Sequence, residues 1–466
     1  MSEIKMETKV DHWKKRHFVF FFLLFFIFII AGIFVGFTGP EVYKTKELHF
    51  KRDITLSNFS ESVTIVKLNR LNQFLFVNLH FQNNGPKEES MVSNFTLDLY
   101  GINNFNNSYK QWQKISSTNH IRKINCLPNS NCTEHTLVYE PYLHYKNYHL
   151  EFNVNLNEEH PSLEDLYIEF HFINKSMTYF ELFMRYTFLI ITIISISYFL
   201  KKIKKIAYSN LNIEQKWICW LLLLLIFFNN PIYPTIILSH SRLVSFLNGI
   251  FTATFLITIS GFWLCNLDGI RLQAHERTFS KFYLPKCIPL AILWFLFFII
   301  YIWSQIHPMD DPQYEAAHDI PGFFVIEIII ICLYGIYFLW SIFVTIRSFK
   351  KIGNSPQQKK RFCLFFSLAF LVLIFTILTI YGRFITKIKN TSGEFMATYT
   401  IYNVYLLFYT YSILPASTVQ KEIKIQNNGA FYEHDTDSLL SHNSIDESDL
   451  ENNIEMKDQI TDRSNN

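Results

Sequence analysis

The residues of this chain that could do chemistry lie in or beside long apolar runs. The segment Asn230-Pro231-Ile232-Tyr233-Pro234 interrupts one such run near its end. Proline removes a backbone donor and clashes with the preceding turn, so it leaves carbonyl groups without partners. Inside a membrane, such a break persists only where protein or a water-filled cavity satisfies the backbone. Asn230, Pro231 and Pro234 are therefore candidates for lining a ligand cavity, and a purely structural kink is the alternative.

Two ionisable residues within apolar runs are further candidates. Glu327 lies inside one run, and Arg383 lies at the end of another. Charged groups in the hydrocarbon region are costly and often functional. The two side chains would face each other across a helical bundle or bind a polar group of a ligand. The alternative is that each side chain reaches out to the membrane interface.

Signatures of catalysis and metal binding are absent from the sequence. It contains no His-Glu-x-x-His, no Gly-x-Ser-x-Gly and no phosphate-binding Gly-x-x-x-x-Gly-Lys. Two His and several Asp lie in 305–321, but their spacing fits no ligand pattern. A net charge of +3 gives no basic surplus of the kind that nucleic acid attracts. We therefore expect no enzyme, no cofactor, no metal site and no nucleic-acid partner.

The elements that must position these residues are membrane-spanning helices. Half of the 466 residues are hydrophobic, and 48 are Phe. A bilayer core needs a helix of about 20 apolar residues. Eight runs satisfy this requirement, namely 18–37, 183–200, 217–238, 244–267, 287–304, 322–346, 362–382 and 397–414. The first exceeds the roughly 7–15 apolar residues of a signal peptide and lacks a small-residue cleavage site, so an uncleaved anchor is favoured over a removed signal peptide.

The distribution of Lys and Arg predicts the orientation of the chain, because cytoplasmic loops are rich in both. Basic residues precede the first span, follow the second and fill the loops 268–286 and 347–361. The N-terminus and the C-terminus are therefore expected in the cytoplasm. Asn-x-Ser/Thr sequons all fall on the other side, where we expect sugars on Asn58, Asn94, Asn106, Asn131, Asn174 and Asn390.

Residues 38–182 have the pattern of a β-rich domain outside the cytoplasm. Tyr148 to Leu156 alternate apolar and polar side chains, and so do Leu166 to Phe172. This period of two indicates half-buried strands, and several of them in one stretch predict a small β-sandwich. Cys126 and Cys132 lie in this domain, where an oxidising compartment favours a disulfide over two free thiols.

The C-terminal segment 415–466 is polar and acidic, and we expect it to be a disordered cytoplasmic tail. Asp435 precedes Leu439-Leu440 with the spacing of an acidic dileucine sorting signal. Such a signal would recruit sorting adaptors, although the pattern is loose enough to occur by chance.

Local strings in the chain resemble those of a known family. In chain order they are Arg16-His17-Phe18-Val19, Gly39-Pro40, Ile213-Glu214-Gln215-Lys216-Trp217, Asn230-Pro231 with Pro234, Phe262-Trp263-Leu264-Cys265, Gly269-Ile270-Arg271, Phe282-Tyr283-Leu284-Pro285-Lys286 and Asp311-Pro312 with Tyr314. In order and spacing these strings resemble the transmembrane protein 181 family, which is similar to Wntless and to the GOLD-domain seven-helix proteins. The resemblance covers nearly all of 16–414.

The resemblance implies a polytopic α-helical membrane protein. Its parts would be a cytoplasmic N-terminus (1–17), one anchor helix (18–37), a luminal or extracellular β-sandwich (38–182), a receptor-like bundle of seven transmembrane helices (183–414) and the tail (415–466). It also implies residence in Golgi, endosomal or plasma membranes.

The layout favours a receptor-like protein that binds a luminal or extracellular protein or lipidated ligand in membrane trafficking. Membrane lipids would be further partners. The alternative is a signalling receptor like the G-protein-coupled receptors, although Asp268-Gly269-Ile270-Arg271 separates the acid and the arginine that adjoin in their usual switch. A channel or transporter is least favoured, because the sequence has no internal repeat.

Overall fold

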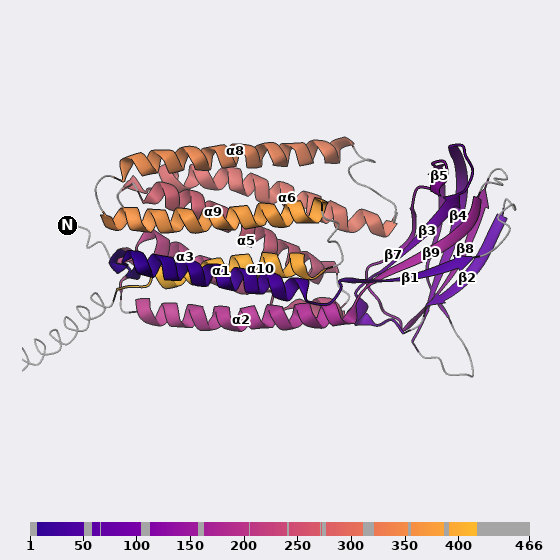
Figure 1. Ribbon diagram of the computed structural model, residues 1–466, viewed down its shortest axis with the longest axis horizontal. Coiled ribbons are helices and arrows are strands. Elements are labelled where there is room, and N and C mark those ends of the chain that lie inside the picture. The colour runs from indigo at the N-terminus through magenta and orange to yellow at the C-terminus, as the bar shows by residue number, and fades with distance from the viewer. Residues whose placement is uncertain are drawn as a thin grey trace, which may run out of the picture.

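The computed structural model describes residues 7–50, 58–65, 67–103, 112–156, 163–204, 206–239, 242–270, 272, 276–310, 321–352, 356–385 and 391–416. Figure 1 shows a bundle of long helices with a β-sandwich at one end. We call the end of the bundle that faces the sandwich the sandwich end, and the opposite end the far end. The N-terminal helix α1 (Lys15–Phe37) runs through the bundle to the sandwich, and the chain then returns through the other helices.

The apolar runs form long helices because a helix pairs every backbone N–H and C=O within the segment, as a bilayer without water requires. After the strands come α2 (Lys175–Ile203), α3 (Ile213–Phe228), α4 (Tyr233–Ser239), α5 (Arg242–Gly269), α6 (Leu284–Asp310), α8 (Pro321–Lys351), α9 (Pro356–Ile385) and α10 (Gly393–Ser412). Among the described residues, seven helices are long and apolar enough to cross a membrane, with α3 and α4 counted as one. The predicted polytopic fold is therefore confirmed.

Two predicted spans differ from the structure in detail. The run 397–414 corresponds to α10, which is less apolar than the other seven helices. Most of its residues are buried against neighbouring helices, so its Tyr, Thr and Asn side chains meet protein rather than lipid. Helix α2 begins at Lys175, ahead of the predicted boundary at 183, because the side chain of Asn174 caps a polar first turn that a hydropathy count overlooks.

The predicted β-sandwich is confirmed as two antiparallel sheets. One sheet contains β1 (Tyr43–Phe50), β9 (Leu163–Ile173), β3 (Leu75–Asn83), β6 (Ser130–Asn131) and β7 (His135–Glu140). The other sheet contains β2 (Asn58–Ile65), β8 (Asn147–Leu156), β4 (Glu89–Ile102) and β5 (Gln113–Cys126). The inner faces supply one shared apolar core, in which Leu75, Leu99, Leu150 and Ile168 are fully buried. Alternation along the strands is what leaves each outer face polar.

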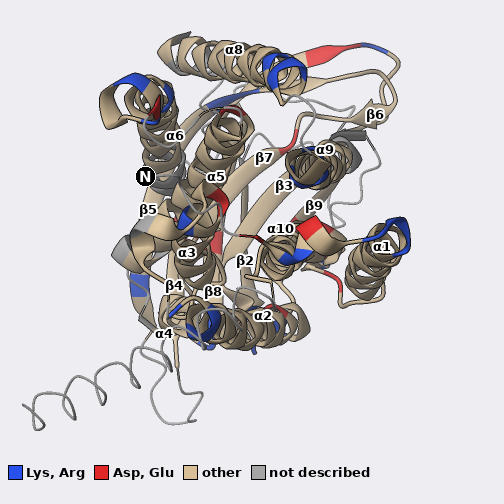
Figure 2. Ribbon diagram, turned by 90° about the vertical axis from the view of Figure 1, so that its left-hand side faces the viewer, with Lys and Arg blue, Asp and Glu red and all other residues tan. Residues whose placement is uncertain are grey.

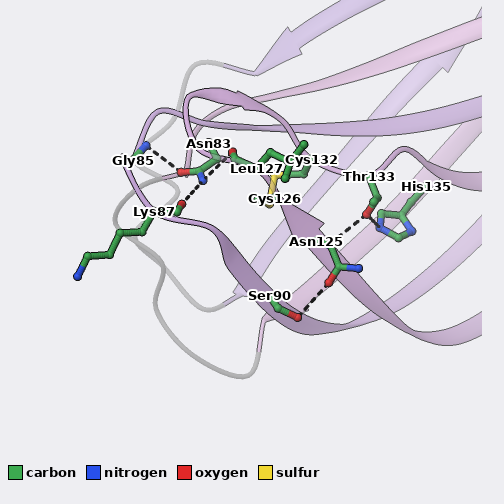
Figure 3. The surroundings of a disulfide bond; sticks show 10 residues. All are labelled: Asn83, Gly85, Lys87, Ser90, Asn125, Cys126, Leu127, Cys132, Thr133 and His135. Carbon is green, nitrogen blue, oxygen red and sulfur yellow. Dashed lines mark hydrogen bonds between the residues drawn. A yellow bond between two sulfur atoms is a disulfide. The ribbon is translucent and has the colours of Figure 1, made fainter.

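The predicted disulfide between Cys126 and Cys132 is confirmed, and it lies at the edge of the sandwich (Figure 3). Beside it, the Asn83 side chain donates to the carbonyls of Lys87 and Leu127. The same side chain accepts from the backbone of Gly85, so one buried amide holds the turn between β3 and β4. The disulfide and the Asn83 amide together hold this edge of the sandwich in place.

A small-residue stripe on α1 packs it against α10. A Cβ added to Gly32 would lie 2.3 Å from Thr400 Oγ1, and one added to Gly36 would lie 2.7 Å from Met396 Cβ. Glycines four residues apart share a helix face and let two backbones approach closely, as in the Gly-x-x-x-Gly pairs of membrane helices. The N-terminal helix is therefore a packed member of the bundle.

Replacing Gly32 by Leu should separate α1 from α10 and destabilise the protein by about 1–3 kcal/mol, since an overpacked contact forces neighbours apart. The check is the thermal unfolding of the purified protein in detergent. Ala31→Leu is the matched control, because Ala31 is exposed on the same helix. Equal melting temperatures for the two variants would contradict this packing.

The far end of the bundle is closed by the N-terminal segment. Lys9 N donates to Leu414 O at 2.9 Å, and Ala416 N donates to Glu7 O at 3.1 Å. The Asp11 carboxylate, whose side chain has no solvent exposure, receives two hydrogen bonds from the Arg361 guanidinium of α9. Both described ends of the chain thus lie together, opposite the sandwich (Figure 1).

Candidate functional site at the junction of sandwich and bundle

The sandwich is joined to the bundle through the 3-10 turn η2 (Arg70–Asn72) and the first turns of α2. Thr178 Oγ1 of α2 donates to the carbonyl of Leu71 at 2.7 Å. Asn72 Nδ2 donates to the carbonyl of Ile173, the last residue of β9, at 2.8 Å. The first bond joins the sandwich to α2, and the second holds η2 against the end of β9, so the two parts meet through specific polar contacts.

Gln73, which directly follows η2, contacts two helices of the bundle. Its backbone has φ 58° and ψ −55°, a conformation that costs free energy for a residue with a side chain. Its Nε2 lies 3.0 Å from Thr178 Oγ1 and 3.3 Å from the hydroxyl of Tyr233. The unfavourable backbone therefore places an amide from the sandwich against α2 and α4.

A buried ion pair lies directly behind Tyr233. The Arg185 guanidinium contacts Glu181 Oε1, one turn earlier on α2, at 2.6 and 3.0 Å. The Tyr233 hydroxyl donates to the other carboxylate oxygen, Glu181 Oε2, at 2.6 Å. Only 5% of the surface of Arg185 is exposed. Charges buried this deeply within a bundle persist only when they are paired and hydrogen-bonded.

Aromatic rings complete the surroundings of the cation. The guanidinium lies 4.2 Å from the ring centroid of Tyr233 and 4.7 Å from that of Tyr399 on α10. It also donates a hydrogen bond to the Tyr399 hydroxyl. Ring faces attract cations electrostatically, most strongly where water is excluded. We call Glu181, Arg185, Tyr233 and Tyr399 the charged cluster.

One helical turn deeper, three polar side chains form a closed network. Asn229 and Asn403 exchange amide hydrogen bonds of 2.9 and 3.0 Å. Asn229 Nδ2 also lies 3.2 Å from Thr192 Oγ1. All three side chains are fully buried. This network joins α2, α10 and the end of α3 below the charged cluster.

The predicted break in the third span is present in the structure, where α3 ends at Phe228 and α4 begins at Tyr233. Asn230 has a positive φ of 54° and donates from Nδ2 to Asn248 Oδ1 at 2.7 Å. Its own Oδ1 is buried and has no hydrogen-bond partner among the described residues. The carbonyl of Pro231 accepts from the Tyr186 hydroxyl at 3.1 Å. Protein groups thus satisfy much of the freed backbone, and Pro234 lies in the first turn of α4.

The other candidates from the sequence lie on other elements or outside the described residues. Glu327 and Arg383 lie on α8 and α9, but their side chains fall outside the described part. Among the sequons, Asn131 is exposed on β6, Asn94 is half-buried on β4, and Asn174 is buried as the cap of α2. The side chain of Asn58 and the whole of Asn106, Asn390, Asp435, Leu439 and Leu440 lie outside the described residues.

Sequence reasoning missed the charged cluster because it weighed each ionisable residue alone. Arg185 marks the edge of the second apolar run and looks interfacial. A usable signal was the spacing of Thr178, Glu181, Arg185 and Thr192, which places four polar side chains on one face of α2.

A carboxyl at the bundle-facing edge of the sandwich should make stability depend on pH. Burial raises the pKa of Glu140, at the end of β7, to about 7. The folded protein then binds a proton that the unfolded chain releases near pH 4.5, so stability falls as pH rises from about 4.5 to 7. Glu140→Gln should remove this loss, which is on the order of 2 kcal/mol at pH 7.5.

The measurement is the melting temperature of the full chain in detergent between pH 5 and 7.5. The Gln variant should gain stability mainly at the upper end of this range. Glu151→Gln, which replaces an exposed carboxylate on β8, is the control and should follow the wild type. A pH profile unchanged by Glu140→Gln would show that this carboxyl does not titrate in the range.

Fold and site together define the class: a multi-pass membrane protein in which a β-sandwich contacts a helical bundle through a polar junction. Residues 174–417, more than half of the chain, match the family described as Wntless-like, transmembrane domain, and the chain belongs to that family. The chain is also 28% identical over 433 residues to transmembrane protein 181 from Homo sapiens. The aligned residues cover 90% of this chain and 89% of the relative. The resemblance read from the sequence is confirmed.

Proposed function

We propose that this protein is a receptor-like membrane protein that binds a luminal or extracellular protein or lipidated ligand in membrane trafficking. It would act by binding and not as an enzyme. The observation that carries the proposal is the junction, in which Gln73 of the sandwich contacts Tyr233 of the charged cluster. A residue held in an unfavourable backbone conformation between two parts is suited to report binding on one part to the other.

The proposed sidedness places the sandwich in the lumen or outside the cell. Lys and Arg gather at the far end, which Figure 2 views directly, at the ends of α1, α8 and α9. Cytoplasmic ends of membrane helices carry such an excess. Both described chain ends lie there too, which fits eight crossings if α10 is counted with the seven apolar helices. The exposed sequon at Asn131 lies on the opposite, sandwich side.

In this proposal the sandwich binds the ligand, and the junction changes the contacts of the charged cluster in response. A ligand that shifts the sandwich relative to α2 would draw Gln73 away from Thr178 and Tyr233. Tyr233 would then be free to release Glu181, and the charged cluster would gain groups able to bind a polar part of the ligand. Such groups inside a membrane commonly mark ligand paths.

Proximity labelling from the sandwich tests ligand capture. The labelling enzyme would be inserted after Lys87, which is exposed in the turn between β3 and β4. In the comparison, the same labelling enzyme replaces residues 50–175, so that it stays on the same side of the membrane without the sandwich. We expect luminal or secreted proteins to be labelled by the full chain and lost from the deletion. The same set of labelled proteins in both would contradict capture by the sandwich.

Membrane lipids are proposed partners of the bundle itself. A groove of about 440 Å³ lies between α1, α2 and α10, near the far end. Its walls are mostly apolar and include Phe20, Leu24, Ile191 and Leu407. Trp13 and His17 border it at the level where the polar N-terminal segment begins. An acyl chain of a surrounding lipid suits such walls.

The trafficking part of the proposal rests on the acidic dileucine sequence at Asp435, Leu439 and Leu440. Sorting adaptors would be its partners, and a Golgi, endosomal or plasma membrane its location. Replacing both leucines by Ala should shift the steady-state distribution of the protein and its uptake from the cell surface. An unchanged distribution and uptake would exclude tail-directed sorting by this signal.

The structure gives the signalling alternative little support. Asp268, at the end of α5, pairs with Lys286 of α6 at 2.8 Å, and both side chains are buried. The Asp268 carboxylate therefore forms an ion pair with α6 at the far end of the bundle. Recruitment of G proteins or arrestin would be the outcome that revives this alternative.

A further inference from the structure

Three ligand-type side chains meet on the outer face of the sheet β1-β9-β3. They are His80 of β3, Glu169 of β9 and Glu134, which directly precedes β7. One ligand atom from each lies within 4.8 Å of the other two. His80 Nε2 lies 3.2 Å from Glu169 Oε2 and 3.8 Å from Glu134 Oε1.

Sheet register explains the convergence. Asn78 pairs with Glu169 and His80 pairs with Tyr167, so Glu169 is the diagonal neighbour of His80 on the same face. On the other side of β3, Leu79 pairs with His135, which brings the preceding Glu134 beside His80. Three residues distant in sequence are therefore fixed by paired backbones.

The imidazole nitrogen at the centre is short of a partner. His80 has only 8% of its surface exposed, and its Nε2 makes no hydrogen bond with any described residue. Two carboxylate oxygens lie close to it, but not in the directions that an N–H donor needs. A buried polar atom left this way costs about 1–3 kcal/mol. A metal ion would satisfy it and would also separate two carboxylates that otherwise repel.

Surrounding groups hold the three side chains in place. The rings of His80 and Tyr167 stack with centroids 4.6 Å apart and an angle of 5° between them. Asn78 Nδ2 donates to Glu134 Oε1, and His171 Nε2 lies 3.2 Å from Glu169 Oε2. Outer groups that orient ligands in this way are a regular part of metal sites.

We propose that His80, Glu134 and Glu169 bind a divalent transition-metal ion, with Zn²⁺ as the expected ion. Zinc accepts imidazole nitrogen and carboxylate oxygen at about 2.0–2.2 Å, which places tetrahedral ligand atoms about 3.4 Å apart. The separations of 3.2 and 3.8 Å around His80 Nε2 agree with this spacing. Calcium prefers oxygen ligands only, so the imidazole argues against it. His171 or water completes the coordination.

The test is zinc binding by the full-length protein purified in detergent. The protein is stripped with a chelator and titrated with ZnCl₂ against a chromophoric zinc indicator. We expect one zinc equivalent that is weakened at least tenfold in Glu169→Gln and in His80→Gln. Glu134→Gln should weaken it as well, and because this side chain is 52% exposed, its loss disturbs folding least. Zinc should raise the melting temperature of the wild type and leave that of the three site variants unchanged.

The control is a histidine–carboxylate pair that has no third ligand among the described residues. His149 Nε2 lies 3.3 Å from Glu151 Oε1 on the other sheet of the sandwich. His149→Gln should therefore keep the zinc equivalent. Equal zinc affinity and stoichiometry in the wild type and in all three site variants would overturn the proposal. Each variant must match the wild type in melting temperature with chelator present.

Discussion

Replacing Arg185 by Met should cost about 3–5 kcal/mol of stability, because it leaves the Glu181 carboxylate buried without its cation. The loss should appear as a lower melting temperature of the full chain in detergent and as poor delivery to the cell surface. The two aromatic rings that flank the guanidinium would lose their cation as well. No other single substitution in the bundle is expected to have a larger effect.

A second replacement distinguishes a lost ion pair from a packing defect. Adding Glu181→Gln to Arg185→Met removes the uncompensated charge and should recover part of the stability, with a coupling free energy above about 1 kcal/mol. Lys114→Met breaks an exposed pair with Asp98 on the sandwich and should change little. Purely additive losses in the double variant would contradict the account of the charged cluster.

Replacing Asp11 by Ala should open the far end of the bundle and cost about 3 kcal/mol. The change removes both hydrogen bonds between the carboxylate and the buried Arg361 guanidinium, whose Nη1 lies 4.0 Å from Glu214 Oε2. Thr8 would lose both bonds to the carboxylate, of 2.7 and 2.9 Å. Hydrogen exchange across residues 7–13 and the melting temperature are the measurements. Glu7→Gln, at an exposed carboxylate of the same segment, is the control.

The same contact has a defined pH dependence. Burial acts to raise the pKa of Asp11, but the hydrogen bond and the charge of Arg361 outweigh it and hold the pKa below its usual range. The stabilisation is therefore complete above the unfolded pKa of about 4 and is lost as pH falls through the folded value. The Ala variant should approach the wild type in stability only in strong acid. A gap that stays constant down to that range would contradict the ion pair.

Much of the architecture could be predicted from the sequence, because length and polarity alone constrain a chain in a bilayer. Seven of the eight predicted runs correspond to helices long and apolar enough to span a membrane, and the eighth, 397–414, corresponds to the less apolar α10. Period-two alternation correctly predicted the two-sheet domain, and the oxidising compartment predicted the Cys126–Cys132 bridge. The break at Asn230 could also be predicted from the sequence, because proline disrupts a helix through its effect on the adjacent turn. The Gly32-x-x-x-Gly36 stripe was equally legible and was overlooked.

The candidate site was harder to predict, because it depends on contacts between distant segments. Gln73 reaches Tyr233 only because η2 packs on α2, and no local pattern encodes this. Likewise, His80 and Glu169 become neighbours through strand register, which depends on the pairing of β3 with β9. Arg185 lies near the start of the second apolar run, and its paired carboxylate lets it lie inside the bundle.

The central claim is that the sandwich and the two chain ends lie on opposite sides of the membrane. Two epitope tags on one full chain test it, one after Lys87 in the sandwich and one at the C-terminus. Selective permeabilisation of the plasma membrane should expose the C-terminal tag to antibody. The sandwich tag should be reached only from the cell surface or after full solubilisation. Staining of the C-terminal tag on intact cells, or new staining of the sandwich tag on selective permeabilisation, would contradict the claim, and the receptor proposal with it.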